Sequence, residues 1–214
     1  EREIRILVLG LDNAGKTTIV RRLCDKPIDE IEPTLGFSIQ TLDYDLSKTG
    51  TTPETTTTTT TTQTVEKTTL SQVYQLHLWD IGGQSTIRAY WRNYFEKTDG
   101  IVWVVDSGDR HRLGLVRDEL ETILDQERLA GASLLVLANK SDLEGAMGPE
   151  PIAKALGLKT GSTDATNNND NSTKKDHSSR HWTIRASSAV TGEGLAGAID
   201  WLVRDITDRI YFAA

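Results

Sequence analysis

The sequence predicts an α/β fold, in which a doubly wound, mostly parallel six-stranded sheet carries helices on both faces. Uninterrupted apolar runs over 100–106 and 133–138 are typical of parallel strands that are covered on both sides. Between them, apolar residues recur at helical spacing over 111–130. Strand and helix patterns alternate in this way along most of the chain, which favours a sheet that binds its ligand beyond the carboxyl ends of its strands.

The same periodicities predict the other elements. Strands are expected over 4–10, 37–46, 73–80 and 182–186, and helices over 16–25 and about 193–211. The segments 37–46 and 73–80 form a hairpin, and Tyr74, Leu76 and Leu78 share one side of its second strand. One stripe of the last helix holds Leu195, Ile199, Leu202, Ile206 and Ile210.

Two polar segments depart from this plan. Residues 47–70 include eight consecutive threonines, Thr55–Thr62, and residues 160–180 are rich in Asn, Ser, Thr, Asp and Lys. Neither segment holds enough apolar surface to offset the entropy lost on ordering. We therefore expect one domain over residues 1–214 with two disordered loop insertions.

Composition argues against a nucleic-acid-binding, a membrane-spanning or a disulfide-bonded protein. The chain has 214 residues and a net charge of −7, without the basic run that a nucleic-acid-binding surface needs. No apolar stretch is long enough to span a membrane. The single cysteine, Cys24, excludes an internal disulfide and fits a reducing compartment such as the cytoplasm. We expect it to be a small buried apolar residue on the first helix rather than a reactive thiol.

The first motif is Gly10-Leu11-Asp12-Asn13-Ala14-Gly15-Lys16-Thr17, a G-x-x-x-x-G-K-[ST] loop between a strand and a helix. Its glycines allow successive backbone N–H groups to face a phosphate chain. Lys16 would add a positive charge between the terminal phosphates, and the hydroxyl of Thr17 would ligate Mg²⁺. The motif predicts a P-loop NTPase.

A second motif, Trp79-Asp80-Ile81-Gly82-Gly83-Gln84, ends the second hairpin strand. Asp80 would hold Mg²⁺ through water, the Gly83 N–H would meet the terminal phosphate, and Gln84 would orient the attacking water. Alone, D-x-x-G is usually an ordinary turn. Thr34, on the loop before the first hairpin strand, would ligate Mg²⁺ and contact the γ-phosphate, so that loss of this phosphate releases the loop.

The sequence Asn139-Lys140-Ser141-Asp142 indicates which base is bound. The Asp142 carboxylate would accept hydrogen bonds from guanine N1 and N2, for which adenine has no matching donors. Lys140 would pack its stem on the base and Asn139 would tie the loops together. Ser187-Ser188-Ala189 would add a backbone N–H to the guanine carbonyl, and we expect the insertion over 160–180 to lie near this end of the site.

Together these motifs resemble the ADP-ribosylation factor family of small GTPases. The resemblance is carried by G-L-D-N-A-G-K-T-T at 10–18, P-T-L-G-F at 33–37, W-D-I-G-G-Q at 79–84 and N-K-x-D at 139–142. It implies a GTP/GDP switch with Mg²⁺ as cofactor and slow intrinsic hydrolysis, with Gln84 as the catalytic residue and Thr17 and Thr34 as metal ligands. The implied nucleotide-binding residues are Asp12, Asn13, Ala14, Gly15, Lys16, Thr17, Thr18, Thr34, Gly83, Asn139, Lys140, Asp142, Ser188 and Ala189.

The resemblance also implies partners. No arginine stands out as a built-in transition-state finger, so a GTPase-activating protein is expected to supply one. One branch of the family, which this sequence resembles most, implies a monomer in the cytoplasm or on microtubules. It would act with a tubulin-folding cofactor and with a prenyl-binding carrier of lipid-modified cargo. Phe37, Trp79 and Tyr94 fall at the positions of the family's effector patch, although any one of them is as readily a core residue.

Two other functions are compatible with parts of this pattern. A non-hydrolysing scaffold would keep the fold and bind partners regardless of nucleotide, but such proteins usually lose one of Lys16, Thr17, Thr34 or Gln84, all of which are intact here. An adenine-specific ATPase is disfavoured by Asn139, Lys140 and Asp142.

Overall fold

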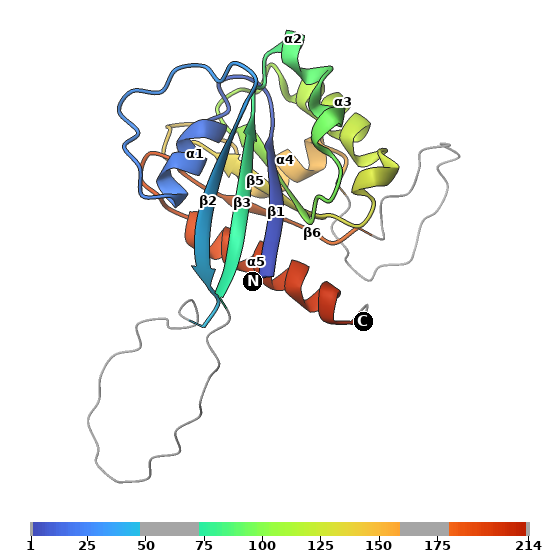
Figure 1. Ribbon diagram of the computed structural model, residues 1–214. Coiled ribbons are helices and arrows are strands. Elements are labelled where there is room, and N and C mark those ends of the chain that lie inside the picture. Colours follow the sequence, from blue (N-terminus) through green and yellow to red (C-terminus); the bar gives the residue numbers. More distant parts are fainter. Residues whose placement is uncertain (1, 48–72, 159–179, 213–214) are drawn as a thin grey trace, which may run out of the picture.

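The computed structural model describes residues 2–47, 73–158 and 180–212, which build one six-stranded sheet with helices on both faces (Figure 1). The elements are β1 (Arg2–Leu9), α1 (Lys16–Leu23), β2 (Phe37–Asp45), β3 (Val73–Ile81), α2 (Ser85–Arg88), the 3₁₀ helix η1 (Trp91–Tyr94), β4 (Gly100–Asp106), α3 (Leu113–Leu124), the 3₁₀ helix η2 (Glu127–Leu129), β5 (Ser133–Asn139), α4 (Pro149–Ala155), β6 (Trp182–Ala186) and α5 (Leu195–Phe212).

The sheet has the strand order β2-β3-β1-β4-β5-β6. Only β2 is antiparallel to its neighbour, with Phe37 opposite Ile81 and Asp45 opposite Val73. The other four pairings are parallel, so the carboxyl ends of five strands share one edge of the sheet. The predicted class, doubly wound and mostly parallel, is confirmed.

Burial explains why these segments are strands. Every residue of β5 is buried, as are the first six of β4, because these strands lie inside the sheet with helices above and below. In β3, burial alternates and places Tyr74, Leu76 and Leu78 inward, as their spacing predicts.

Two apolar cores lie on opposite faces of the sheet. One contains Ile19 of α1 and a buried stripe of α5, namely Leu195, Ile199, Leu202 and Ile206. The other contains Leu120 of α3 and Ile152 of α4. The helices thus cover both faces, which holds the strand ends rigidly in place (Figure 1). The side chain of Ile210 is outside the described part of the structure.

Most of the two predicted insertions, residues 48–70 and 160–179, falls outside the described residues. The insertion over 160–180 was expected to lie near the base-binding end of the site. For the residues that follow it and that the structure describes, this expectation is wrong. Trp182 begins β6 opposite Leu134, near the start of parallel β5, so this flank lies at the amino edge of the sheet. Arg180 is held there by its hydrogen bonds to the carbonyls of Leu129 and Ala132.

Two short helices, α2 and α4, were not predicted from the sequence. The four residues of α2 include no buried one, so they show no apolar periodicity. Within the described ranges, no helix combines the length and apolarity that crossing a bilayer requires.

Candidate nucleotide-binding site

The loop between β1 and α1 lies at the carboxyl edge of the sheet and has a backbone that favours glycine. Gly10 has φ +142° and Gly15 has φ +93°, a region that other residues rarely adopt. A Cβ on Gly15 would lie 2.4 Å from Nδ2 of Asn139, so the loop also needs glycine for close packing. Helix α1 begins directly after it at Lys16, and Thr18 is half-buried in its first turn. The N-terminus of α1 therefore faces the loop, as an anion-binding helix does.

Lys16 is buried inside this loop. Its ammonium donates a hydrogen bond to the Leu11 carbonyl at 2.8 Å. Burial lowers the pKa of Lys16 to about 8, and the carboxylates of Asp80 and Asp12 partly oppose this shift. A phosphate in the loop would supply the negative charge that a buried ammonium favours.

Three oxygen-bearing side chains from separate segments meet beside Lys16. The Thr17 hydroxyl donates to Oδ2 of Asp80 at 2.7 Å and lies 2.8 Å from the Thr34 hydroxyl. Thr34 also approaches the same Asp80 oxygen, at 3.4 Å. The structure therefore brings together the two predicted metal ligands and the carboxylate that was expected to act through water.

This cluster fits Mg²⁺. Oδ1 of Asp80 is buried and has no hydrogen-bond partner among the described residues, and burial raises the pKa of this carboxyl. Hydroxyl and carboxylate oxygens are the hard donors that Mg²⁺ takes. Within the described residues no group of three or more His, Cys, Asp or Glu exists that would hold a metal alone. Phosphate oxygens and water would complete the coordination of an ion here.

The segment after β3 packs directly on the phosphate loop. The Gly82 N–H donates to the Gly36 carbonyl at 2.9 Å, which joins this segment to the loop that carries Thr34. A Cβ on Gly83 would lie 2.4 Å from the Gly10 carbonyl oxygen, so only glycine fits this approach. Gln84 is half-buried directly before α2 and makes no capping hydrogen bond there.

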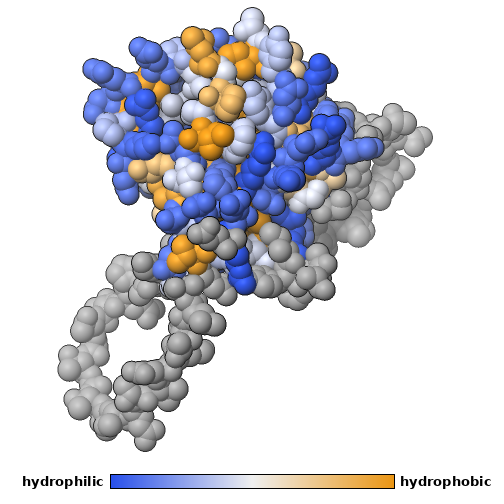
Figure 2. Space-filling model, in the orientation of Figure 1, coloured by the Kyte–Doolittle hydropathy of each residue, from blue (hydrophilic) through white to orange (hydrophobic). Residues whose placement is uncertain are grey.

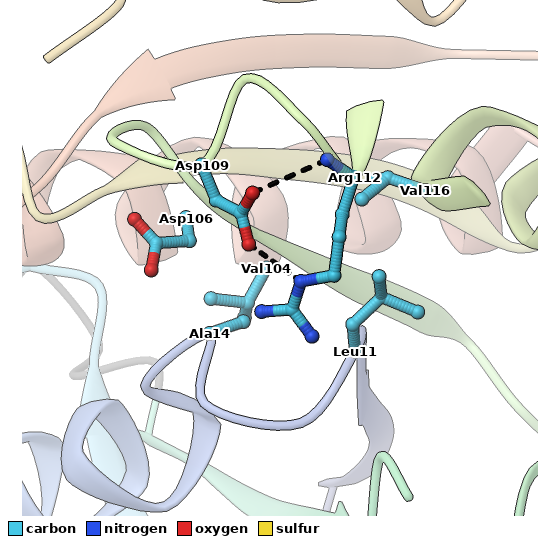
Figure 3. A pocket seen from close by; sticks show the side chains of 7 residues that line it. All are labelled: Leu11, Ala14, Val104, Asp106, Asp109, Arg112 and Val116. Atoms are coloured by element: carbon cyan, nitrogen blue, oxygen red, sulfur yellow. Dashed lines mark hydrogen bonds and ion pairs between the residues drawn. The ribbon is translucent and has the colours of Figure 1, made fainter. Parts of the chain in front are cut away.

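Two arginines that the sequence analysis did not single out lie against the outside of the loop. Arg112 donates to the carbonyl of Asp12 at 3.2 Å, and its guanidinium is 3.3 Å from the Asp12 carboxylate. Figure 3 shows Arg112 held by Asp109 beside a small hollow lined by Leu11, Ala14, Val104, Asp106, Asp109, Arg112 and Val116. Arg88 of α2 lies 3.6 Å from the same Asp12 carboxylate. No local motif marks these pairings, which join distant parts of the chain.

The base-binding end is built around Asn139, which is 1% exposed. Its Nδ2 donates to the Ala14 carbonyl at 2.8 Å, and its Oδ1 accepts from the Ala189 N–H at 3.0 Å. Asn139 therefore ties the phosphate loop to the segment that contains the buried Ser188 and Ala189, as predicted for a residue that joins these loops.

Lys140 and Asp142 follow Asn139. Lys140 has φ +64°, and its ammonium pairs with Asp106 at 2.6 Å, a partner that sequence reasoning missed. Asp142 is exposed, and the Ser141 N–H between them donates to the Ser187 carbonyl at 3.0 Å. The four-residue motif thus presents a lysine stem and a carboxylate at the same edge as the phosphate loop.

Phe37, Trp79 and Tyr94 form one aromatic cluster next to this site. Phe37 stacks on Trp79 at 5.6 Å and lies 5.1 Å from Tyr94, measured between ring centroids. The Arg5 guanidinium lies 3.9 Å from the Trp79 centroid. Phe37 is 47% exposed, and Leu35, Ile39 and Tyr90 are also exposed apolar residues. In Figure 2, apolar side chains interrupt the hydrophilic surface at the upper end, where α2 lies in Figure 1.

Comparison with known proteins agrees with this geometry. The sequence profile of the ADP-ribosylation factor family matches residues 1–51 and 46–206. ADP-ribosylation factor-like protein 2 of Arabidopsis thaliana is 47% identical over 99% of this chain and 91% of the relative, and the protein of the same name from Drosophila melanogaster is 46% identical over the same shares. ADP-ribosylation factor-like protein 3 of Chlamydomonas reinhardtii is 39% identical over 96% of this chain and 92% of its own length.

A solved structure shows the same fold. The Arl6 small GTPase from Trypanosoma brucei, with a bound nucleotide analogue, superposes with a TM-score of 0.68 at 24% identity, over 96% of this chain and 98% of that one. As a member of this family of GTPases, the chain binds GTP and GDP with Mg²⁺ and hydrolyses GTP. Its family match and its relatives agree with the resemblance carried by its motifs. The chain belongs to the ADP-ribosylation factor family of small GTPases.

Proposed function

We propose that the nucleotide state of this GTPase controls its aromatic cluster through Thr34 and Gly83. The observation that supports this proposal most directly is that both residues contact the site. Thr34 contacts Thr17 and Asp80, and Gly83 packs against the phosphate loop. Phe37 lies three residues after Thr34, and Trp79 lies one residue before Asp80. A loop released on loss of the γ-phosphate would therefore change the position of these aromatic side chains.

In this proposal each site residue has a distinct role. Lys16 neutralises the terminal phosphates, with backbone N–H groups over 12–18 around them. Thr17 and Thr34 would hold Mg²⁺, which when bound would offset the charge of the phosphates. Gln84 orients a water for in-line attack on the γ-phosphate, with GDP and phosphate as products.

An activating protein would supply the transition-state arginine. Arg88 and Arg112 are the arginines that lie against Asp12, and each is also engaged by a further carboxylate, Glu119 or Asp109. Because both guanidinium groups are already paired on the outer side of the loop, neither is free to stabilise the charge on the reacting phosphate. This supports slow intrinsic hydrolysis that a partner accelerates.

Guanine selectivity is assigned to Asp142, with Lys140 against the base and the Ala189 N–H near its carbonyl. We expect Asp142→Asn to weaken GTP binding and to strengthen XTP binding, because an amide can donate to the oxygen that xanthine has in place of the guanine amino group. Competition of GTP, XTP and ATP against a fluorescent nucleotide measures this. If Asp142→Asn kept its preference for GTP over XTP, Asp142 would not be the residue that reads the base.

At the level of the cell, we propose a monomeric switch in tubulin folding and microtubule biogenesis, in the cytoplasm and on microtubules. Its partners would be a tubulin-folding cofactor and a prenyl-binding carrier, from which the GTP-bound form releases lipid-modified cargo. The resemblance to one branch of the family and the partly exposed aromatic cluster, in which Phe37 is the exposed member, support this proposal. Nucleic acid is not among the expected partners.

The first experiment is to denature the purified protein and identify the released nucleotide by chromatography. Stoichiometric GDP or GTP is expected. The protein loaded with GDP or with a non-hydrolysable GTP analogue is then tested for binding to the purified cofactor and carrier. Equal binding in both states, together with an empty protein that takes up no GTP with Mg²⁺, would instead indicate a nucleotide-independent scaffold.

A further inference from the structure

Arg88, the last residue of α2, contacts three different parts of the molecule. Its Nε donates to the Gly83 carbonyl at 2.9 Å, and its Nη1 pairs with Glu119 of α3 at 2.9 Å. Its Nη2 lies 3.6 Å from the Asp12 carboxylate in the phosphate loop. The side chain is only 12% exposed. Arg88 therefore joins the segment after β3 to two elements that the core holds in place.

Helix α2 has few other means of being held. It is four residues long and includes no fully buried residue, so helix propagation and apolar packing, which here comes from the half-buried Ile87, stabilise it only weakly. Helix α3, in contrast, places Val116, Leu120, Ile123 and Leu124 in the core. Glu119 is thus fixed in position by α3, and its ion pair with Arg88 holds α2 against α3, next to which it lies (Figure 1).

The two peptide units on either side of Gly83 are each oriented by a different side chain. The indole N–H of Trp91 donates to the Gly82 carbonyl at 2.9 Å, which orients the Gly82–Gly83 peptide and the Gly83 N–H. Arg88 donates to the next carbonyl, that of Gly83, and orients the Gly83–Gln84 peptide. The direction in which the Gln84 side chain leaves the backbone therefore depends on Arg88.

We propose that Arg88, anchored by Glu119 and Asp12, is a positioning residue for GTP hydrolysis that acts through Gln84. This inference rests on the proposed water-orienting role of Gln84. Arg88 itself touches neither phosphate nor water in this assignment. Its bridging geometry needs a planar fork with several donors, which arginine has and lysine lacks.

The test measures single-turnover hydrolysis of GTP carrying a radiolabelled γ-phosphate, with Mg²⁺, in the full chain. Arg88→Gln is expected to slow hydrolysis by roughly tenfold or more, because small misplacement of a catalytic group is costly. Its affinity for GDP and its Tm should change little. The matched control is Arg92→Gln, which removes an exposed arginine four residues away and should keep the wild-type rate. Arg88→Lys is expected to fall between them.

Glu119→Gln separates positioning from folding. It keeps the shape of the anchor but removes its charge, so it should slow hydrolysis less than Arg88→Gln does. The double variant should be no slower than Arg88→Gln alone, because both changes act through one contact. If both single variants hydrolysed GTP as fast as Arg92→Gln, the positioning role would be refuted, whatever happened to their Tm.

Gln84→Leu distinguishes this inference from the function on which it rests. Loss of hydrolysis in Gln84→Leu together with a normal rate in Arg88→Gln would refute the role of Arg88 alone. A normal rate in Gln84→Leu would refute the role of Gln84, and the positioning inference with it.

Discussion

Lys16 makes the stability of the nucleotide-free protein depend on pH. Burial lowers its pKa from 10.5 to about 8 in the folded chain, whereas the unfolded chain keeps the ordinary value. Below pH 8 both states are protonated and the folded state carries the full cost of the buried charge, on the order of 3 kcal/mol. Between pH 8 and 10.5 the unfolded state binds more protons, so the contribution of Lys16 to the free energy of unfolding rises with pH.

We therefore expect Lys16→Met to show less gain in stability than the wild type between about pH 7.5 and about pH 10. Urea unfolding of both nucleotide-free proteins at the two pH values measures the difference, and the other titrating groups cancel in the comparison. Saturating GDP should reduce the wild-type gain, because its phosphates stabilise the charged ammonium. The same pH dependence in both proteins would show that the Lys16 ammonium is not destabilised by burial.

At the scale of single residues, the sequence predicted those site residues that belong to short motifs. The Thr17, Thr34 and Asp80 oxygens meet, and Asn139 joins two loops, because Asp80 and Asn139 lie at strand ends that the topology brings to one edge, and Thr17 and Thr34 lie on the segments next to that edge. The partners of these residues were not predictable. Lys140 pairs with Asp106 from another strand, and no spacing rule connects two segments that meet only in the folded state.

Among the elements, the segment that follows β3 and the phosphate loop approach each other closely through their backbones. A methyl group on Gly83 would lie 2.4 Å from the Gly10 oxygen and 2.4 Å from the Leu11 carbonyl carbon, both backbone atoms that cannot turn aside. Gly83→Ala should therefore lower the free energy of unfolding by about 1–3 kcal/mol. It should also reduce the preference for GTP over GDP, because the junction must open.

Gly114 in α3 is the matched control, since a methyl group there would meet nothing within 4 Å. Gly114→Ala should stabilise the protein by about 0.4–1 kcal/mol through the unfolded chain. Thermal unfolding and competition between the two nucleotides measure both variants. An unchanged nucleotide preference in Gly83→Ala would mean that Gly83 does not report the γ-phosphate.

The elements that burial periodicity defines were predicted to within a few residues. The bounds of β4 and β6 agree with the sequence, and the predicted helix over 111–130 divides into α3 and η2. Helix α2 was missed because it has no buried side chain, so its position depends on Arg88 and on the segments beside it. An element that depends on contacts with distant segments cannot be predicted from the periodicity of its own sequence.

Across the whole molecule, the nucleotide site and the end of the β2–β3 hairpin lie at opposite edges of the sheet. Asp45 pairs with Val73 at the start of β3, whereas Asp80 reaches the site at its other end. The hairpin end is also held from the opposite side, because Arg204 of α5 donates to the Leu46 carbonyl at 3.1 Å and Leu46 is buried. The segment between β2 and β3 can therefore be changed without displacing the nucleotide site.

We expect replacement of residues 48–72 by a short Asn-Gly turn to leave the affinities for GDP and GTP within about twofold of wild type, because loop length enters stability only weakly. The Tm should stay the same or rise, since closing a shorter loop loses less entropy. A second variant with residues 48–72 in reversed order keeps length and composition and tests the sequence of the segment alone. Competition of GDP and GTP against a fluorescent nucleotide measures both affinities in each variant. A changed affinity only in the shortened variant would show that segment length acts on the site, and a change in both would show that the segment's own sequence does.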